Sequence, residues 1–168
     1  MSKSSGLAVL ALLIAIGALG LGVYQIFFVT EAEDEESGIK NTWYKFEYAS
    51  KDTNPVSTII TIDTLTINFT VSSGESVYFH FSTWATVQGS GNSFIRFNFV
   101  LDGVILAGPQ YPWWSIRTMG DRIEAPVSFQ LSLDTATAGA HNVTISIVGS
   151  DINNNIFSST LMVQTYVP

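Results

Sequence analysis

The strongest constraint on this chain is a long apolar run near its N-terminus. No charged residue occurs from Gly6 to Val29. An α-helix rises about 1.5 Å per residue, so that a run of about 20 apolar residues is long enough to cross a bilayer. We therefore expect a tail at residues 1–5 and a transmembrane helix at residues 6–29.

A cleaved secretory signal is the alternative interpretation of this run. Such signals carry an apolar region of about 7 to 15 residues followed by a small-x-small cleavage site. The run here is longer, and its last residues, Tyr24 to Val29, are mostly bulky. A weak cleavage site remains at Val29–Ala32, so that cleavage stays open as the alternative to an uncleaved anchor.

The charges that flank the run predict its orientation. Lys3 is the only basic side chain before it, and the next one is Lys40. Because positive charge favours the cytoplasmic side, we expect a cytoplasmic N-terminus and an extracellular C-terminal domain. Residues 30–40 include a dense acidic cluster, which indicates a solvated, extended stem. The cluster consists of Glu31, Glu33, Asp34, Glu35 and Glu36.

Small residues recur along one face of the predicted helix, at Ala11, Ala15, Ala18 and Gly22. Such faces allow close helix packing in lipid, which predicts self-association through this stripe. The alternative is that alanine and glycine are simply frequent in transmembrane helices.

Composition narrows the classes of partner. The chain has 14 acidic and 7 basic residues and a formal net charge of −7. An acidic surface repels phosphate backbones, so we expect no nucleic-acid partner. There is no cysteine, and a domain of this size can be stabilised by its core without disulfides.

Strict alternation of apolar and polar residues marks the rest of the chain, residues 41–168. Successive side chains of a strand point to opposite faces, so this pattern predicts half-buried β-strands. About eight short strands separated by turns indicate a two-sheet antiparallel β-sandwich, with a jelly roll favoured over an immunoglobulin-like fold. The clearest predicted strands are Trp43–Tyr48, Leu65–Val71, Val77–Ser82, Ile95–Leu101, Val127–Leu133, Val143–Ile147 and Leu161–Tyr166.

Two turn signals are specific. Asp102–Gly103 lies between two apolar segments and predicts a type I′ hairpin, in which both central residues have positive φ. Ile60 and Ile62 are out of phase with the residues after Asp63–Thr64. This shift predicts a bulge or a bend at which the strand changes sheets.

Part of this pattern resembles known families. The segments Ser72–Ser76, Asp102–Gly103, Gly139–Thr144 and Leu161–Val163 are similar to the trimeric jelly-roll heads of complement-type proteins, tumour-necrosis-factor-like ligands and phage fibre tips. That resemblance implies a homotrimer used in adhesion or recognition. The chain also resembles single-span archaeal envelope proteins, pilin-like subunits and archaellum stator components, which implies a structural subunit.

The sequence contains no catalytic constellation. His80 and His141 lie far apart and have no zinc-ligand spacing. The loop at Asp151–Asn155 offers oxygen atoms but lacks the glycine and closing glutamate of a calcium loop. We therefore predict no enzyme, no metal and no cofactor. Asn68 and Asn142 begin N-glycosylation sequons, which are typical of external domains.

The candidate binding residues are Tyr111, Trp113, Trp114 and Arg117. Clustered aromatic and arginine side chains are typical of interface hot spots and sugar-stacking platforms. The alternative is a lid that closes one end of the sandwich. Because adjacent side chains of an extended segment point in opposite directions, at most one of the two tryptophan rings is expected to belong to the core.

These observations predict a non-catalytic, membrane-anchored cell-surface protein that acts in recognition or adhesion. We expect a glycoprotein and a homo-oligomer, with a trimer favoured. Its expected partners are the membrane and other surface proteins or glycans. The alternative is a structural subunit of a surface filament or envelope assembly.

Overall fold

The computed structural model describes residues 37–89, 91–108, 113–134 and 136–168. Nearly all regular structure in this part of the chain is β-strand, as the alternation predicts. The elements are β1 (Gly38–Glu47), β2 (Lys51–Asp52), β3 (Ile60–Thr61), the 3-10 turn η1 (Asp63–Leu65), β4 (Ile67–Val71), β5 (Ser76–Val87), β6 (Ser93–Leu101), β7 (Val104–Ile105), β8 (Trp114–Thr118), β9 (Ile123–Leu133), β10 (Gly139–Gly149) and β11 (Asn155–Val167).

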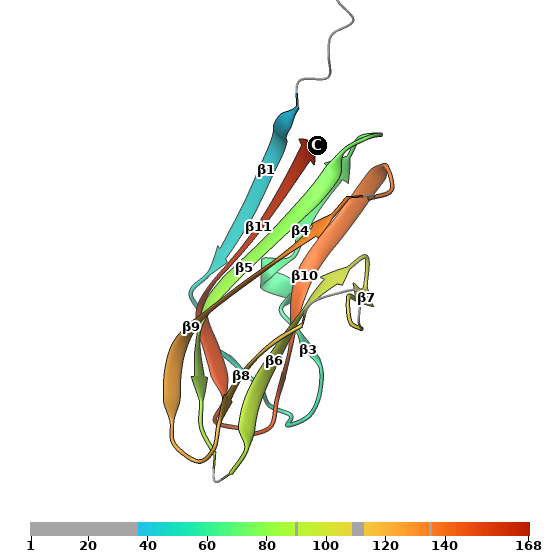
Figure 1. Cartoon of the computed structure of the whole chain (residues 1–168). Helices are drawn as coiled ribbons and strands as arrows, with labels where there is room; N and C mark the ends of the chain where they lie inside the picture. Colours follow the sequence, from blue (N-terminus) through green and yellow to red (C-terminus); the bar gives the residue numbers. More distant parts are fainter. Residues whose placement is uncertain (1–36, 90, 109–112, 135) are drawn as a thin grey trace, which may run out of the picture. The chain divides into compact units, whose positions relative to one another are not determined.

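The strands form two antiparallel sheets that pack face to face (Figure 1). Sheet A has the order β1-β11-β5-β9, with β2 paired to β11. Sheet B has the order β3-β10-β6-β7, with β4 also paired to β10 and β8 also paired to β6. The predicted two-sheet antiparallel sandwich is confirmed.

The pairing of the eight longer strands is nested, which defines a jelly roll. The first of them pairs with the last, β1 with β11, and the next pairs inward are β4 with β10, β5 with β9 and β6 with β8. The pairings β11–β5 and β10–β6 then join these ladders into two sheets. Rolling up one long hairpin in this way gives the jelly roll rather than the immunoglobulin topology.

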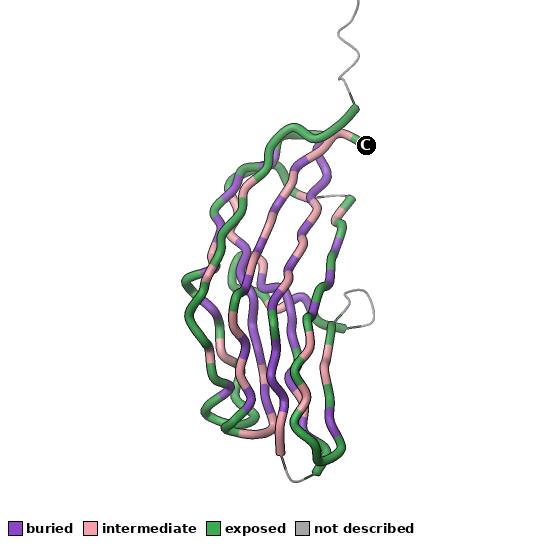
Figure 2. Tube along the Cα trace, turned by 90° about the vertical axis from the view of Figure 1, so that its left-hand side faces the viewer, coloured by how far each residue is buried: buried purple, intermediate pink, exposed green. Residues whose placement is uncertain are grey.

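The core lies between the sheets and consists of the inward members of each alternating strand. Figure 2 shows buried and exposed positions alternating along the strands. Five phenylalanine rings form its centre, with centroids 4.7 to 6.3 Å apart. They are Phe79, Phe81, Phe97, Phe99 and Phe129, all of which the alternation assigns to one strand face. Among the described residues, the buried hydrophobic core is drawn from residues 62–163, and Ser37–Pro168 forms one compact unit around it.

The predicted bend at Asp63–Thr64 is present, but the change of sheets expected there is wrong, and the expected stem extends too far along the chain. The interruption at Asp63–Thr64 is the turn η1, and the strands on both sides of it, β3 and β4, pair with β10. The chain therefore stays in sheet B, because the turn absorbs the phase change without a crossover. In addition, β1 begins at Gly38 and pairs with β11, so the last residues of the expected stem, 38–40, belong to sheet A.

The Asp102–Gly103 turn is confirmed. Asp102 has φ of 50° and Gly103 has φ of 78°, and the turn connects β6 to β7. Positive φ at both central residues is the signature of a type I′ hairpin.

The predicted helix 6–29, with Ala11, Ala15, Ala18 and Gly22, lies outside the described residues, as does Tyr111. Among the residues that are described, no helix has the length and apolar character required to cross a membrane.

The two ends of the sandwich differ in what they carry. Gly38 pairs with Val167, so that the N-terminal attachment and the C-terminus share one end (Figure 1). β5 starts near this end, where Ser76 pairs with Tyr166. Its length of about 37 Å carries the chain to the far end, where the connection to β6 lies.

Candidate functional site

The register of β6 and β8 brings aromatic and arginine side chains together on the outer face of sheet B. Phe97 and Ile95 of β6 are core residues, so Phe94 and Arg96 point outward. Phe94 lies directly opposite Arg117 of β8. Side chains opposite each other on one face of an antiparallel pair are in contact range.

These side chains alternate in a cation–π stack. The guanidinium carbon of Arg117 lies 5.6 Å from the centroid of the Phe94 ring. That of Arg96 lies 5.8 Å from the same ring and 4.7 Å from the ring of Trp113. We call Phe94, Arg96, Trp113 and Arg117 the Arg–aromatic platform.

The two platform arginines have few polar partners among the described residues. In the described part of the chain, the ion pairs are Arg122–Glu124 and His141–Asp102, and neither involves Arg96 or Arg117. The hydrogen bond given by the two guanidinium groups there is the 3.4 Å contact from Arg117 Nε to Ser115 Oγ. Both groups are exposed, so their remaining N–H donors face solvent and suit a planar anion.

Trp113 and Trp114 lie on opposite faces of sheet B. Trp113 is on the outer face with Arg96, whereas Trp114 pairs with Phe97 and therefore has the inward orientation at the sheet edge. The opposite directions agree with the expectation for an extended segment. Their exposed fractions are 46% and 49%, so neither ring is a core residue. Trp114 also begins strand β8, where the sequence favoured a loop.

The platform lies toward the far end of the sandwich. Phe94 is the second residue of β6 and follows the β5–β6 connection, and Arg117 is opposite it. Both are therefore remote from the end at which Gly38 joins the N-terminal segment.

A second polar cluster surrounds His141 at the Gly38 end. His141 Nδ1 lies 2.7 Å from Asp102 Oδ2, and His141 Nε2 lies 2.7 Å from the carbonyl oxygen of Thr137. A carboxylate and a carbonyl can only accept, so this geometry favours the protonated imidazole, in which both ring nitrogens donate. The hydrogen bonds with Asp102 and then Thr137 raise the pKa of His141, against the opposing effect of burial. With no free lone pair, this ring is suited to neither base catalysis nor metal binding.

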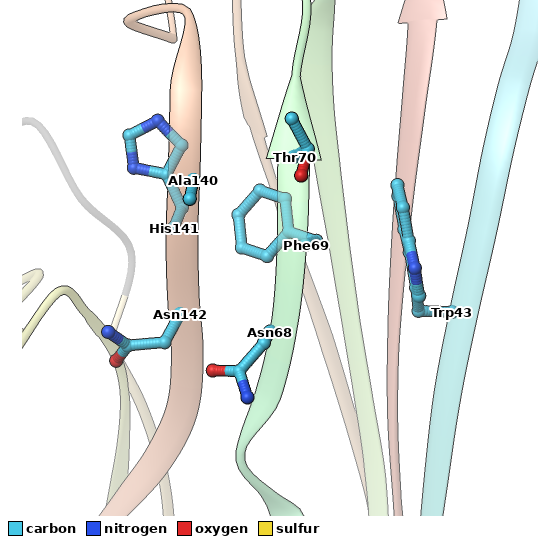
Figure 3. Close-up of a pocket in the computed structure, with 7 residues that line it drawn as sticks. All are labelled: Trp43, Asn68, Phe69, Thr70, Ala140, His141 and Asn142. Carbon is cyan, nitrogen blue, oxygen red and sulfur yellow. The ribbon is translucent and has the colours of Figure 1, made fainter.

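Two pockets adjoin this cluster, and His141 and Phe69 line both. One, of about 370 Å³, lies between β1, β4 and β10 (Figure 3). The other, of about 540 Å³, reaches between the sheets toward Val77 and Phe79. The His141 ring lies over the ring of Phe69, with centroids 5.6 Å apart, and covers this buried core residue.

The two sequon asparagines meet in the smaller pocket. Asn68 of β4 and Asn142 of β10 are directly opposite each other in the sheet, on its outer face (Figure 3). Asn68 is exposed and Asn142 is half-buried. Two sequons that are remote in sequence thus lie side by side in the sheet.

The remaining candidates have structural partners. His80 Nε2 lies 2.9 Å from Ser128 Oγ on the outer face of sheet A. In the Asp151–Asn155 loop, Asn154 is fully buried, donates to Phe94 O and accepts from Gln88 N, so its side chain ties the loop to β6. Within the described ranges, no group of three or more histidine and carboxylate side chains is arranged to hold a metal ion.

Sequence reasoning missed Phe94, Arg96 and the His141–Asp102 pair. Phe94 and Arg96 read as an ordinary alternating strand, and only the register with β8 brings them to Trp113 and Arg117. The spacing of Phe94 and Arg96, two residues apart on one face, was the available signal.

Topology and surface together define the chain from Ser37 onward as a jelly-roll domain with an exposed Arg–aromatic platform. No protein-family model matches the chain, and no curated protein matches it. Solved structures that are similar include the infectious bursal disease virus VP2 subviral particle, at 13% identity and a TM-score of 0.43, over 74% of this chain and 32% of that one. The chain spans about a third of the viral protein.

Two further similar structures are nearer in length. The carbohydrate-binding module CBM36, solved with calcium and xylotriose, has 15% identity and a TM-score of 0.35, over 79% of this chain and 98% of that one. The Bacillus endospore appendages that form disulfide-linked pili have 16% identity and a TM-score of 0.33, over 77% and 91%. At these values the likeness carries no argument about function, and the fold assignment rests on the strand pairings. The expected resemblance to trimeric heads holds as far as the jelly-roll topology.

Proposed function

We propose that the chain is a non-catalytic, membrane-anchored cell-surface recognition protein whose platform binds acidic saccharides. The observation that carries this proposal is the stack of Arg96 and Arg117 against Phe94 and Trp113. It is a local concentration of positive charge that forms no ion pair with any described side chain, on a chain whose net charge is −7.

The chemistry of the platform suits such a ligand. Guanidinium groups bind carboxylates and sulfates through paired N–H donors, and stacking on aromatic rings holds them in a fixed plane. Exposed indole and phenyl rings offer flat apolar surfaces to the faces of sugar rings. An acidic saccharide presents both features together.

The position of the platform supports surface recognition. If residues 6–29 anchor the chain, the domain joins its anchor at the Gly38 end. Within the domain, the platform lies toward the opposite end, near the start of β6, and its side chains are exposed to solvent. Glycosylation at Asn68 and Asn142 belongs to the same proposal, as does a homo-oligomer. The preference for a trimer is what the sequence resemblance to trimeric jelly-roll heads implies.

The experiment is retention of residues 37–168 on three immobilised polysaccharides, namely polygalacturonate, dextran sulfate and neutral dextran. We expect retention on one or both acidic polymers and none on neutral dextran. The Arg96→Gln/Arg117→Gln variant should lose at least about tenfold in affinity, since two charge-assisted contacts disappear.

The matched control is Lys40→Gln/Arg122→Gln, which removes the same charge from exposed sites outside the platform. It should bind like the wild type. An equal loss of affinity in both variants would show that the binding depends on net charge rather than on the platform. Unchanged binding in the platform variant would overturn the proposed site.

A structural subunit of a filament is the second candidate, and strand β1 favours it. This edge strand of sheet A is ten residues long and exposed at eight of them (Figure 2). Long exposed edge strands are templates for pairing with another chain. Fibres of the purified full-length protein in electron micrographs would support this candidate over a discrete surface receptor.

A further inference from the structure

The outer face of sheet A is unusual for so acidic a protein. In the segments Thr42–Phe46, Thr160–Tyr166, Tyr78–Trp84 and Pro126–Ser132, every second residue points away from the core. None of these outward residues is Asp, Glu, Lys or Arg. Four adjacent strands thus present a continuous face without carboxylate, ammonium or guanidinium groups.

Polar groups on this face are already paired with one another across the strands. Tyr78 Oη donates to Gln130 Oε1 at 2.6 Å, and Gln164 Nε2 donates to Thr42 Oγ1 at 3.2 Å. His80 is held by Ser128, as described above. Burying the face therefore leaves few donors or acceptors without a partner, so the desolvation cost is small.

Between these pairs the face exposes large apolar surface. Tyr44 is 73% exposed, Phe46 is 44% exposed and Trp84 is 38% exposed. Met162, half-buried, lies opposite both Tyr44 and His80 and so occupies the middle of the face. Enrichment in aromatic residues and methionine, with depletion of charge, is the composition of interface cores.

We infer that this face docks a second copy of the same chain. Residues 37–168 carry nine acidic and six basic side chains, so two copies repel one another wherever their acidic surfaces approach. The outer face of sheet A is a surface on which two copies meet without juxtaposed charges. Three strand segments of seven residues and one of five, about 4.8 Å apart, cover roughly 410 Å² as a flat area, to which the relief of the side chains adds. This approaches the roughly 500 Å² per partner that a specific interface requires.

The test is the mass of residues 37–168 in solution by sedimentation, over a range of protein concentrations, with chemical cross-linking of the full-length chain as a second measurement. We expect a discrete oligomer of two or three copies. Met162→Lys places a charge at the centre of the face and should give a monomer. Tyr44→Lys also places a charge on this face and should also give a monomer. Because Tyr44 is 73% exposed, this substitution should not disturb folding.

Thr70→Lys is the matched control, because Thr70 is exposed on the outer face of sheet B. It adds the same charge and should leave the oligomer intact, and circular dichroism should show all variants folded. A wild type that is monomeric at every concentration would overturn the inference, as would an oligomer that persists in both face variants. Open-ended polymers that persist in Met162→Lys would show that the chain assembles through the edge strand β1 and would overturn the inference. A monomeric domain that binds a neutral saccharide on the outer face of sheet A would also overturn it, because the face would then be a ligand site.

Discussion

His141 and Asp102 are held together by a turn and a strand register that fit each other. Asp102 Oδ2 lies 2.7 Å from His141 Nδ1, while Asp102 Oδ1 accepts the main-chain N–H of Asn142 at 2.8 Å. The positive φ of Asp102 in the β6–β7 turn aims its carboxylate at β10. One side chain thereby fixes the turn, the neighbouring strand and the imidazole that covers Phe69.

The pair makes stability depend on pH. Partial burial acts to raise the pKa of Asp102, but hydrogen bonds from His141 and Asn142 outweigh it and hold the pKa below 3.8. The pKa of His141 lies above 6.5. The aspartate contribution is lost as pH falls through its lowered pKa, and the histidine contribution is lost as pH rises through its raised pKa. The stabilisation by the His141–Asp102 hydrogen bond is therefore largest between about pH 4 and pH 6.5.

We predict that residues 37–168 unfold at higher denaturant concentration at pH 5.5 than at pH 8.5. His141→Gln should lose about 1 kcal/mol at pH 5.5 and little at pH 8.5, as befits a partly exposed charged hydrogen bond. His80→Gln is the control and should keep the pH difference. If the unfolding midpoint changes as much between pH 5.5 and pH 8.5 in His141→Gln as in the wild type, the His141–Asp102 pair is not the source of the pH dependence.

Gly149 is predicted to be intolerant of any side chain. A Cβ there would overlap Thr53 Oγ1, which itself donates to Asp151 O. Gly149→Ala should cost about 1 to 3 kcal/mol or more through overpacking. Gly91→Ala, where no atom lies within 4 Å, is the matched control and should be nearly neutral. Equal denaturation midpoints for the two variants would contradict the close packing of Thr53.

The two tryptophans should differ in binding rather than in stability. Both rings are about half exposed, so each alanine variant should lose less than the 3 to 5 kcal/mol typical of a core aromatic residue. Trp113→Ala removes the ring beside Arg96 and should weaken retention on the acidic polymer. Trp114→Ala, on the opposite face, should retain binding. A reversed order in parallel melting and binding assays would place the ligand elsewhere.

The orientation of the chain can be tested on intact cells. A glutamate-specific protease should cut within residues 30–37, where the acidic cluster lies, and release a β-rich fragment. Cleavage should stop short of β1, because residues from Gly38 onward are paired with β11. A fragment that forms only after lysis would show that the domain faces the cytoplasm.

Local sequence pattern was sufficient for much of the fold. Alternation identified the core phenylalanines, and the Asp102–Gly103 pair identified its turn, because both depend on residues adjacent in the chain. Strand β8 was missed although Trp114, Ile116 and Thr118 alternate with polar residues. The prolines and aromatic residues before it favoured a loop, and pairing with β6 overrides that local preference.

The sites depend on register, which no local pattern contains. Arg96 meets Trp113, and His141 meets Asp102, only when β6 aligns with β8 and with β10. Trp113 and Arg117 could be selected as candidates from their residue type alone. Their partners Phe94 and Arg96 could not, because residues of these types are also ordinary in a strand. At most one of the two tryptophan rings was expected in the core, and neither is buried there, because among the described strands β8 pairs only with β6 and lies at the edge of sheet B.

The most direct measurement of the central claim is a titration of residues 37–168 with a short oligogalacturonate, followed by NMR of the four indole N–H groups and the arginine Nε–H groups. We predict that the signals of Trp113, Arg96 and Arg117 shift and saturate together. The indole signals of Trp43 and Trp84, which belong to β1 and β5, should stay in place. Shifts at Trp84 with Trp113 unmoved, or no shift at any of these groups, would contradict recognition of acidic saccharides by the Arg–aromatic platform.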